Sequence, residues 1–339
     1  MSEIVMTLDE IGSLTRRVLE RHGLSALQTE PIARIVIAAE ADACRSHGLY
    51  RLPGYVAPLR SGRVRPDAVP RVETVTSGII RVDGDGGFAP AAAEAGRPGL
   101  IEAARANGIA AMALTHCHHF SALWADLEPL TDAGLVAWAF VVGQSSVAPH
   151  GGTRRLMGTN PVAFGWPRPG REPFIFDFAT SAAARGEVEL KRLAGERLPD
   201  GWALGPDGAP TTDPAAALAG ALLPFGGHKG SALSMMVELI AGPLIGEATS
   251  SRVAEMDIHD GGPPPGGELF IAIDPQRLAP GDGWTSEAEA FFAEAGAQPG
   301  LRLPSARRHA ARARTRHEGV AVPAGLVAEV EALLNGIDA

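Results

Sequence analysis

A histidine at position 47 lies in a pattern that could carry proton-transfer chemistry. Ser46, His47 and Gly48 interrupt a stretch of helical periodicity, and Arg51 follows four residues after the histidine. Histidine is the side chain best suited to transfer a proton near neutral pH, and arginine can bind a carboxylate through two parallel hydrogen bonds. If helix resumes after Gly48, Arg51 shares a face with His47, and Ser46 could orient the ring. A lone helical histidine is also often structural, so the spacing leaves both interpretations open.

Three histidines in four positions, His116, His118 and His119, end a stretch that is typical of a buried strand. A zinc site needs its ligands on one side, but consecutive side chains in regular structure point apart, and no nearby acidic residue or cysteine completes a zinc set. Ligands bind at the carboxyl ends of strands in open α/β sheets. We therefore expect this run to line a ligand site and predict no metal.

Two glycine-rich turns indicate anion binding. One runs from His150-Gly151-Gly152 into Gly158-Thr159-Asn160-Pro161, and the other, residues 224–230, opens a long apolar helix. Free N–H groups at a helix N-terminus attract anions, and Lys229 adds a positive charge there. The spacing is not that of a P-loop, so nucleotide hydrolysis is not predicted.

A third glycine turn, residues 84–89, fits the pattern G-x-G-x-x-A that many Rossmann dinucleotide sites share. The preceding strand contains Arg81 and Asp83, which is poor for a buried parallel strand. The acidic residue expected at the end of the next strand is missing, because that strand ends in Thr115-His116. The sequence therefore favours an ordinary turn here.

The elements that must position these residues belong to two regions with different sequence patterns. The periodicity of residues 8–22 and 26–43 predicts helices. The segment 61–70, which contains Gly and Pro, is expected to be a connecting loop. From residue 72, strands and helices alternate, which predicts an α/β domain. The expected strands are 72–82, 108–115, 135–142 and 268–273. The expected helices are 88–107, 122–133, 229–245, 286–295 and 323–334, and 185–213 is expected to be a surface excursion.

Composition excludes several classes of protein. The chain has 339 residues, 45% of them hydrophobic, and a net charge of -9, which disfavours both disorder and general nucleic-acid binding. Arginines cluster between Arg302 and Arg316, either as a solvated helix face or as a phosphate-binding segment. Two cysteines make no CxxC pair, and no secretory signal or membrane span is visible, so we expect a cytoplasmic protein.

Together these motifs resemble the malate/L-lactate dehydrogenase family of NAD(P)H-dependent oxidoreductases, over about residues 8–322. The resemblance rests on Ser46-His47-Gly48 with Arg51, the turn 118–120, and the runs 158–161, 176–181 and 224–230. Within the family, runs 51–56, 118–124 and 222–238 look most like reductases of the cyclic imines Δ1-piperideine-2-carboxylate and Δ1-pyrroline-2-carboxylate. The resemblance implies an α/β fold without Rossmann topology. It also implies a helical region at 1–70 packed with residues 300–339, and a cofactor-binding domain at 71–299.

The resemblance also implies residue roles. His47 would be the proton donor with Ser46 as its relay partner, and Arg51 and Thr159 would bind the substrate, Arg51 taking the carboxylate. The relay acid of close relatives is an Asp after a Gly, whereas here Gly186 precedes Glu187. Expected cofactor contacts are Phe120, Ser121, Ala122, Leu123, Trp124, Asp177, Phe178, Ala179, His228, Lys229, Gly230, Arg307 and Arg308.

The expected reaction is reduction of a cyclic imine carboxylate to L-pipecolate or L-proline, usually with NADPH, although NADH remains open. Two alternatives also remain open: a 2-oxo acid reductase of the malate or lactate type, and a ligand-binding homologue without activity. Family members are dimers with the active site near the subunit interface, so a homodimer is expected.

Overall fold

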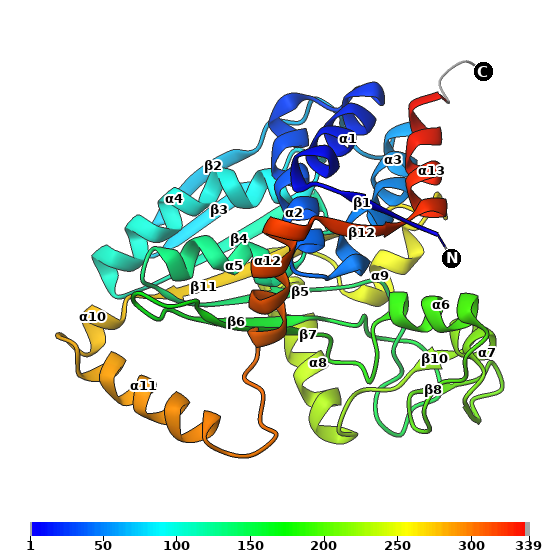
Figure 1. Ribbon diagram of the computed structural model, residues 1–339. Helices are drawn as coiled ribbons and strands as arrows, with labels where there is room; N and C mark the ends of the chain where they lie inside the picture. The colour runs from blue at the N-terminus through cyan, green and yellow to red at the C-terminus, as the bar shows by residue number, and fades with distance from the viewer. Residues whose placement is uncertain (1, 336–339) are drawn as a thin grey trace.

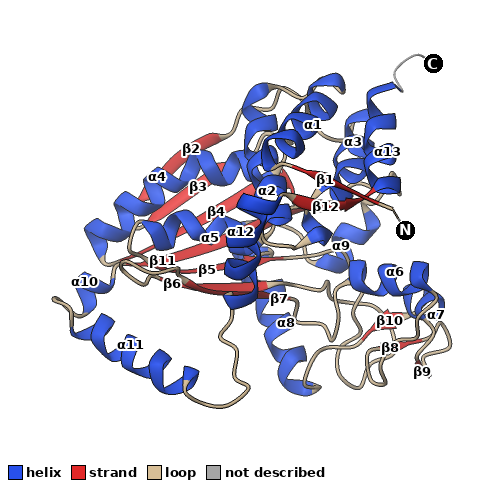
Figure 2. Ribbon diagram, in the orientation of Figure 1, coloured by secondary structure: helices blue, strands red, loops and turns tan. Residues whose placement is uncertain are grey.

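A seven-stranded mixed sheet forms the centre of the computed structural model, which describes residues 2–335 (Figures 1 and 2). In spatial order its strands are β2 (Arg71–Thr76), β3 (Ile79–Asp83), β4 (Ile109–His118), β11 (Pro265–Ile273), β5 (Val136–Val141), β6 (Val162–Trp166) and β7 (Phe174–Phe178). Within the described chain only β3 and β4 pair in parallel, and β11 inserts between β4 and β5 from late in the sequence. A Rossmann sheet is parallel, so the expected α/β fold without that topology is confirmed.

Helices pack on both faces of the sheet, and β11 shows how its residues alternate between them. Phe270 and Ala272 join the core beneath α4 (Ala89–Asn107) and α5 (Leu123–Asp132). Leu269 and Ile271 pack instead with residues of α8 (His228–Ile240) on the other face. This alternation is the period of two expected for a strand buried on both sides.

The N-terminal region is helical, with α1 (Leu8–Arg21), α2 (Ala26–Ala41) and α3 (Leu52–Arg60). Thr7 and Glu10 form a reciprocal capping box that starts α1, since each side chain accepts the other residue's backbone N–H. The C-terminal part packs beside this region: β1 (Glu3–Met6) pairs antiparallel with β12 (Val320–Pro323), and α13 (Ala324–Ala332) follows (Figure 1).

Helix α12 (Ala306–Glu318) ties the end of α2 to the C-terminal segment. The Thr315 hydroxyl donates to the Ala41 carbonyl at 2.7 Å, and Arg312 makes two hydrogen bonds of 2.7 Å with the buried Asp42 carboxylate. A buried carboxylate needs such a partner, so α12 fixes the end of the helix that leads to His47.

The remaining elements surround the sheet. They are α6 (Arg185–Ala194), β8 (Ala203–Leu204), β9 (Pro210–Thr211), α7 (Pro214–Ala219), β10 (Ala221–Leu222), α9 (Ser250–Glu255), α10 (Pro275–Leu278) and α11 (Gly283–Gly296). No helix among residues 2–335 is long and apolar enough to cross a membrane.

One expectation about these elements was incomplete and another was wrong. The segment 185–213, expected to be a surface excursion, begins with a helix, α6, which Gly195 ends with a φ of 69° in the left-handed region. Helix α8 ends at Ile240 rather than Ile245, since Gly242 and Pro243 follow and proline cannot continue a helix.

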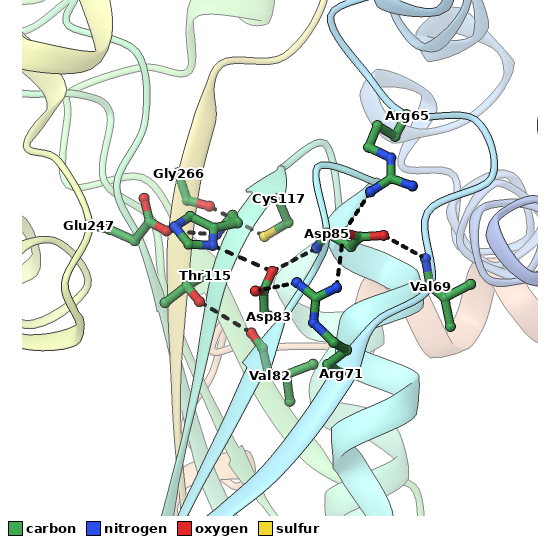
Figure 3. Close-up of polar contacts among 11 residues, drawn as sticks. Arg65, Val69, Arg71, Val82, Asp83, Asp85, Thr115, Cys117, Glu247 and Gly266 are labelled. Carbon is green, nitrogen blue, oxygen red and sulfur yellow. Dashed lines mark hydrogen bonds and ion pairs between the residues drawn. The ribbon is translucent and has the colours of Figure 1, made fainter.

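Hydrogen bonds to β4 and to neighbouring side chains hold the turn at 84–89, and Figure 3 shows those made by Asp83 and Asp85. The N–H groups of Gly84 and Gly86 each donate at 2.8 Å to carbonyls at the end of β4, and the Asp85 N–H donates to Asp83 at 2.8 Å. Arg71 binds both aspartates. These N–H groups are therefore not available to a phosphate, in agreement with the interpretation of the turn as ordinary.

Candidate active site

Two short 3-10 turns present His47 and Arg51: η1 (Arg45–His47) and η2 (Leu49–Arg51). Gly48 joins them where a side chain would not fit, since a Cβ there would lie 2.0 Å from Glu40 Oε1. That oxygen accepts the Leu49 N–H at 2.8 Å, which pins the break in the helix. The predicted interruption after α2 is confirmed, and its cause is a buried carboxylate from the preceding helix.

The imidazole of His47 is held in a defined orientation. Its Nδ1 lies 3.1 Å from the Ser46 hydroxyl, so Nε2 is the nitrogen left to face a substrate. Burial, then the charge of Arg51, then His119, lower the pKa of His47 to about 3. His47 is therefore neutral near pH 7 in the free protein.

Arg51 lies beside His47 without an ionic partner. Its guanidinium carbon is 4.7 Å from the centre of the Phe120 ring, and burial lowers the pKa of Arg51. Among residues 2–335 no carboxylate pairs with it, and its buried Nε has no hydrogen-bond partner. A partly buried arginine in this state is a ready receptor for a ligand carboxylate.

Glu187 is not assembled into a relay with Ser46 in this structure. It is exposed in the first turn of α6 and makes no hydrogen bond to Ser46 or His47 within the described chain. Its neighbour Gly186 does lie near the site, because a Cβ added there would be 4.0 Å from Arg51 Nη2.

Thr159 occupies a tightly held turn. Its carbonyl accepts the Thr180 N–H at 2.8 Å and the Thr180 hydroxyl at 3.1 Å, and the side chain is half-buried. Thr180 directly follows the segment 177–179, so this bond joins the expected substrate-binding threonine to one of the expected cofactor segments.

Several of the expected cofactor contacts touch one another. Asp177 accepts the Trp124 N–H at 3.2 Å, the Arg308 guanidinium lies 5.1 Å from the Trp124 ring centre, and Phe178 packs edge-on against Phe225. Burial raises the pKa of Asp177 to about 6. Of the other contacts, Phe120 and Ala179 are half-buried, Ser121, Ala122 and Leu123 are buried, and Arg307 is exposed.

Two of the expected cofactor segments, at the start of α12 and at the start of α8, carry donors suited to phosphate. A cavity of about 340 Å³ is lined by Arg302, Arg307 and Arg308 at the start of α12, and the buried Arg308 Nε has no partner within the described residues. At the start of α8, His228 and Lys229 are exposed, while Gly230 is buried against the Phe225 carbonyl. The residues present thus fit a phosphate-bearing cofactor.

The structure also reveals a buried charged cluster behind His119 that the sequence reasoning missed. His119 Nε2 lies 3.0 Å from Glu268 Oε2, and the ligand atoms of His119, Asp126 and Glu268 all lie within 4.8 Å of one another. The sequence analysis found no nearby residue that completes a zinc set with the histidine run, and it did not anticipate that Asp126 and Glu268 would meet His119. Glu268 is about 150 positions away in the chain, on β11, and no local pattern could have placed it there.

Hydrogen bonding and charge explain how the cluster is stabilised. The Ser121 hydroxyl donates to Asp126 at 2.5 Å, and burial, then the Glu268 charge, raise the pKa of Asp126 to about 7. Burial lowers the pKa of His119, but the charge and hydrogen bond of Glu268 outweigh it, so the net pKa is raised. His118 bonds instead to the Pro263 carbonyl at 3.4 Å, so the two adjacent histidines do point apart.

Comparison with known proteins gives one consistent result. A model of the malate/L-lactate dehydrogenase family matches residues 6–331. A protein of Ancylobacter novellus named Δ1-pyrroline-2-carboxylate reductase is 61% identical over 330 residues, 97% of each chain. A Δ1-pyrroline-2-carboxylate/Δ1-piperideine-2-carboxylate reductase of Pseudomonas aeruginosa is 50% identical over 98% of this chain and 99% of its own. The crystal structure of Δ1-piperideine-2-carboxylate reductase from Pseudomonas syringae is similar with a TM-score of 0.93 and 41% identity, covering 97% of this chain and 99% of the other.

Proposed function

The chain belongs to the malate/L-lactate dehydrogenase family and is an oxidoreductase, and we propose that it reduces cyclic imine carboxylates with NADPH. The substrates would be Δ1-pyrroline-2-carboxylate, giving L-proline, and Δ1-piperideine-2-carboxylate, giving L-pipecolate. The observation that carries the proposal is the unpaired, partly buried Arg51 beside His47. The names of the similar reductases support the choice of substrate.

Arg51 would bind the substrate carboxylate through two hydrogen bonds, with Thr159 as a second contact. Stacking on Phe120 holds the guanidinium plane in place, so less side-chain freedom is lost when the substrate binds. A clamped carboxylate also fixes which face of the adjacent C=N carbon is presented to the hydride donor.

His47 would donate the proton to the ring nitrogen. In the free protein its pKa is too low for this, and one cause is the charge of Arg51. A substrate carboxylate on Arg51 neutralises that charge, so it should raise the pKa of His47 when the acid is needed. Substrate binding and protonation of His47 are thus coupled through Arg51.

A nicotinamide cofactor, when bound, supplies the hydride to the carbon beside the carboxylate. The chain would hold it through residues 120–124, 177–179 and 228–230 and through the arginines 307 and 308. The preference for NADPH would depend on the arginine-lined cavity, because its donors suit an additional phosphate.

Ser46 and Glu187 would complete the relay. Ser46 already contacts the His47 Nδ1. Glu187 would approach only if the start of α6 moves towards Arg51 when substrate binds, and Gly186 lies close enough to that side chain for a small shift to suffice.

We also propose a homodimer. Helix α8 leaves large apolar side chains exposed on its outer face, namely Leu233, Met235, Met236 and Leu239, the last 60% exposed. A contiguous apolar face of this kind is typical of a subunit contact. Light scattering during size-exclusion chromatography would test the mass in solution.

The deciding experiment compares NADPH oxidation with Δ1-piperideine-2-carboxylate and with pyruvate under identical conditions. Strong turnover of the imine supports the proposal. Turnover of pyruvate alone would move the substrate to 2-oxo acids, the second candidate. Failure to bind NADPH, measured by its fluorescence, would favour a homologue that has lost activity.

A further inference from the structure

A buried carboxylate on α8 holds the turn that carries Thr159. Glu238 is 7% exposed, and its Oε1 accepts hydrogen bonds from the Gly158 N–H at 3.1 Å and the Asn160 Nδ2 at 2.7 Å. The Ser250 hydroxyl donates to the same oxygen at 2.5 Å, and the Ser250 N–H donates to Oε2 at 2.8 Å. The residues on both sides of Thr159 are therefore tied to one carboxylate.

The turn has little freedom to adopt another shape. Asn160 is fully buried with a φ of 40°, in the left-handed region that asparagine tolerates better than most residues. Its side-chain oxygen accepts the Gly143 N–H at 3.0 Å. Gly158 has no space for a side chain, because a Cβ there would lie 2.5 Å from the Asn160 Oδ1.

This arrangement is costly for a protein to build. Within the described residues no lysine or arginine pairs with Glu238, so four neutral donors alone compensate the buried charge. Desolvating a carboxylate without a cation is expensive, and an apolar contact between α8 and the turn would need no such compensation. What the carboxylate adds is geometry, since Oε1 fixes two points of one turn while Oε2 holds Ser250.

We propose that Glu238 is a positioning residue for the substrate subsite. It fixes Thr159 relative to α8, whose first turn carries the exposed His228 and Lys229. Because Thr159 is also tied to Thr180, the substrate-binding threonine and two cofactor segments form one rigid unit. The inference rests on the proposed substrate role of Thr159.

The test is a double-mutant cycle with Glu238→Gln and Thr159→Ala, assayed with Δ1-piperideine-2-carboxylate and NADPH. An amide in place of the carboxylate turns an NH₂ group either towards the Gly158 and Asn160 donors or towards the Ser250 N–H. The second orientation also disturbs the turn, because it displaces Ser250, whose hydroxyl oxygen accepts the Gly158 N–H at 2.7 Å. The turn must then shift, and we expect the imine KM to rise about tenfold with a much smaller change in kcat and in NADPH Kd. In the Thr159→Ala background the same substitution should change KM less than about twofold.

The control is Glu289→Gln on α11. Glu289 is a carboxylate held by two hydrogen bonds from Arg168, and we expect its replacement to leave the imine KM unchanged. If Glu238→Gln does not fold, Ser250→Ala removes one donor to Glu238 and should raise KM about threefold in the same Thr159-dependent way.

The outcomes separate the two claims. An unchanged KM for Thr159→Ala alone would contradict the proposed role of Thr159. A raised KM for Thr159→Ala with an unchanged KM for Glu238→Gln would overturn the inference. So would fully additive effects in the double mutant, or a loss of thermal stability without any change in KM, since either result assigns Glu238 a merely structural role.

Discussion

Replacing Arg51 with methionine should make the free protein's His47 a stronger base. In the unmodified protein the pKa of His47 is about 3, against an ordinary value of 6.5. This difference of about 3.5 pKa units corresponds to roughly 5 kcal/mol of preference for the neutral ring. Burial is the larger cause and persists in the variant, whereas the contribution of Arg51 is lost.

Coulomb's law gives the size that such a contribution should have. A unit charge about 7 Å away in an effective dielectric constant of about 20 contributes roughly 2 kcal/mol. That is between about one and two pKa units, so Arg51→Met should raise the pKa of His47 to between about 4 and 5.

Nuclear magnetic resonance titration of ¹³C-labelled histidine would measure this, with the His47 signal assigned from its absence in His47→Ala. Arg17→Met is the control, because Arg17 is exposed and is not among the causes of the lowered pKa. A His47 signal that titrates near 6.5 in the unmodified protein would refute the argument. A pKa that does not move in Arg51→Met would assign the whole shift to burial and remove the proposed coupling with substrate.

The remaining predictions concern four other residues. His47→Ala should lower kcat between about 100- and 10,000-fold with little change in NADPH Kd, and near-full turnover would show that His47 is not the acid. Glu187→Gln should lower kcat about tenfold while Glu189→Gln, on the same helix, should not; equal effects would exclude a relay role for Glu187. Asp126→Asn tests a pH effect on folding. The pKa of Asp126 is raised to about 7, so the folded protein keeps a proton that the unfolded chain releases above about pH 4. Stability should therefore fall by up to about 4 kcal/mol as pH rises from 4 to 7, and the variant should lose this slope in urea unfolding; an unchanged slope would mean that Asp126 is ionised throughout. Gly86→Ala, at a φ of 76°, should lower stability by about 1 kcal/mol and leave NADPH Kd unchanged, whereas a weakened Kd would revive the dinucleotide interpretation of this turn.

Local pattern was sufficient to predict several elements of the fold. The break at Ser46–Gly48, the strand β4 ending in the histidine run and the helix α4 all follow from periodicity and glycine placement. The helix α6 was not anticipated, because the segment 195–213 that follows it is rich in Gly, Pro and Asp, and these residues are typical of turns and loops.

The residues of the candidate site also differ in how far they could be predicted from the sequence. Neighbours within one motif could be expected from spacing, as His47 and Arg51 were, and the structure places them close enough for the charge of Arg51 to lower the pKa of His47. Residues that act across the fold could not, because Glu238 meets Asn160 across 78 positions and Glu268 meets His119 across 149. Such contacts depend on which strands become neighbours, here on the insertion of β11 between β4 and β5, and single-sequence periodicity does not record that order.

The pairing of β1 with β12 has a consequence for how the protein is made. The turn that contains His47 is held by hydrogen bonds to residues far along the chain. Arg45 donates to the Ala321 carbonyl, and Arg312 binds Asp42. On a ribosome these partners emerge roughly 270 residues after the histidine does. The central sheet can assemble before these partners are made, but the turn at His47 cannot be held until α12 and β12 have been synthesised. A translation product that stops before α12 should therefore contain every strand of the sheet and still lack a formed turn at His47.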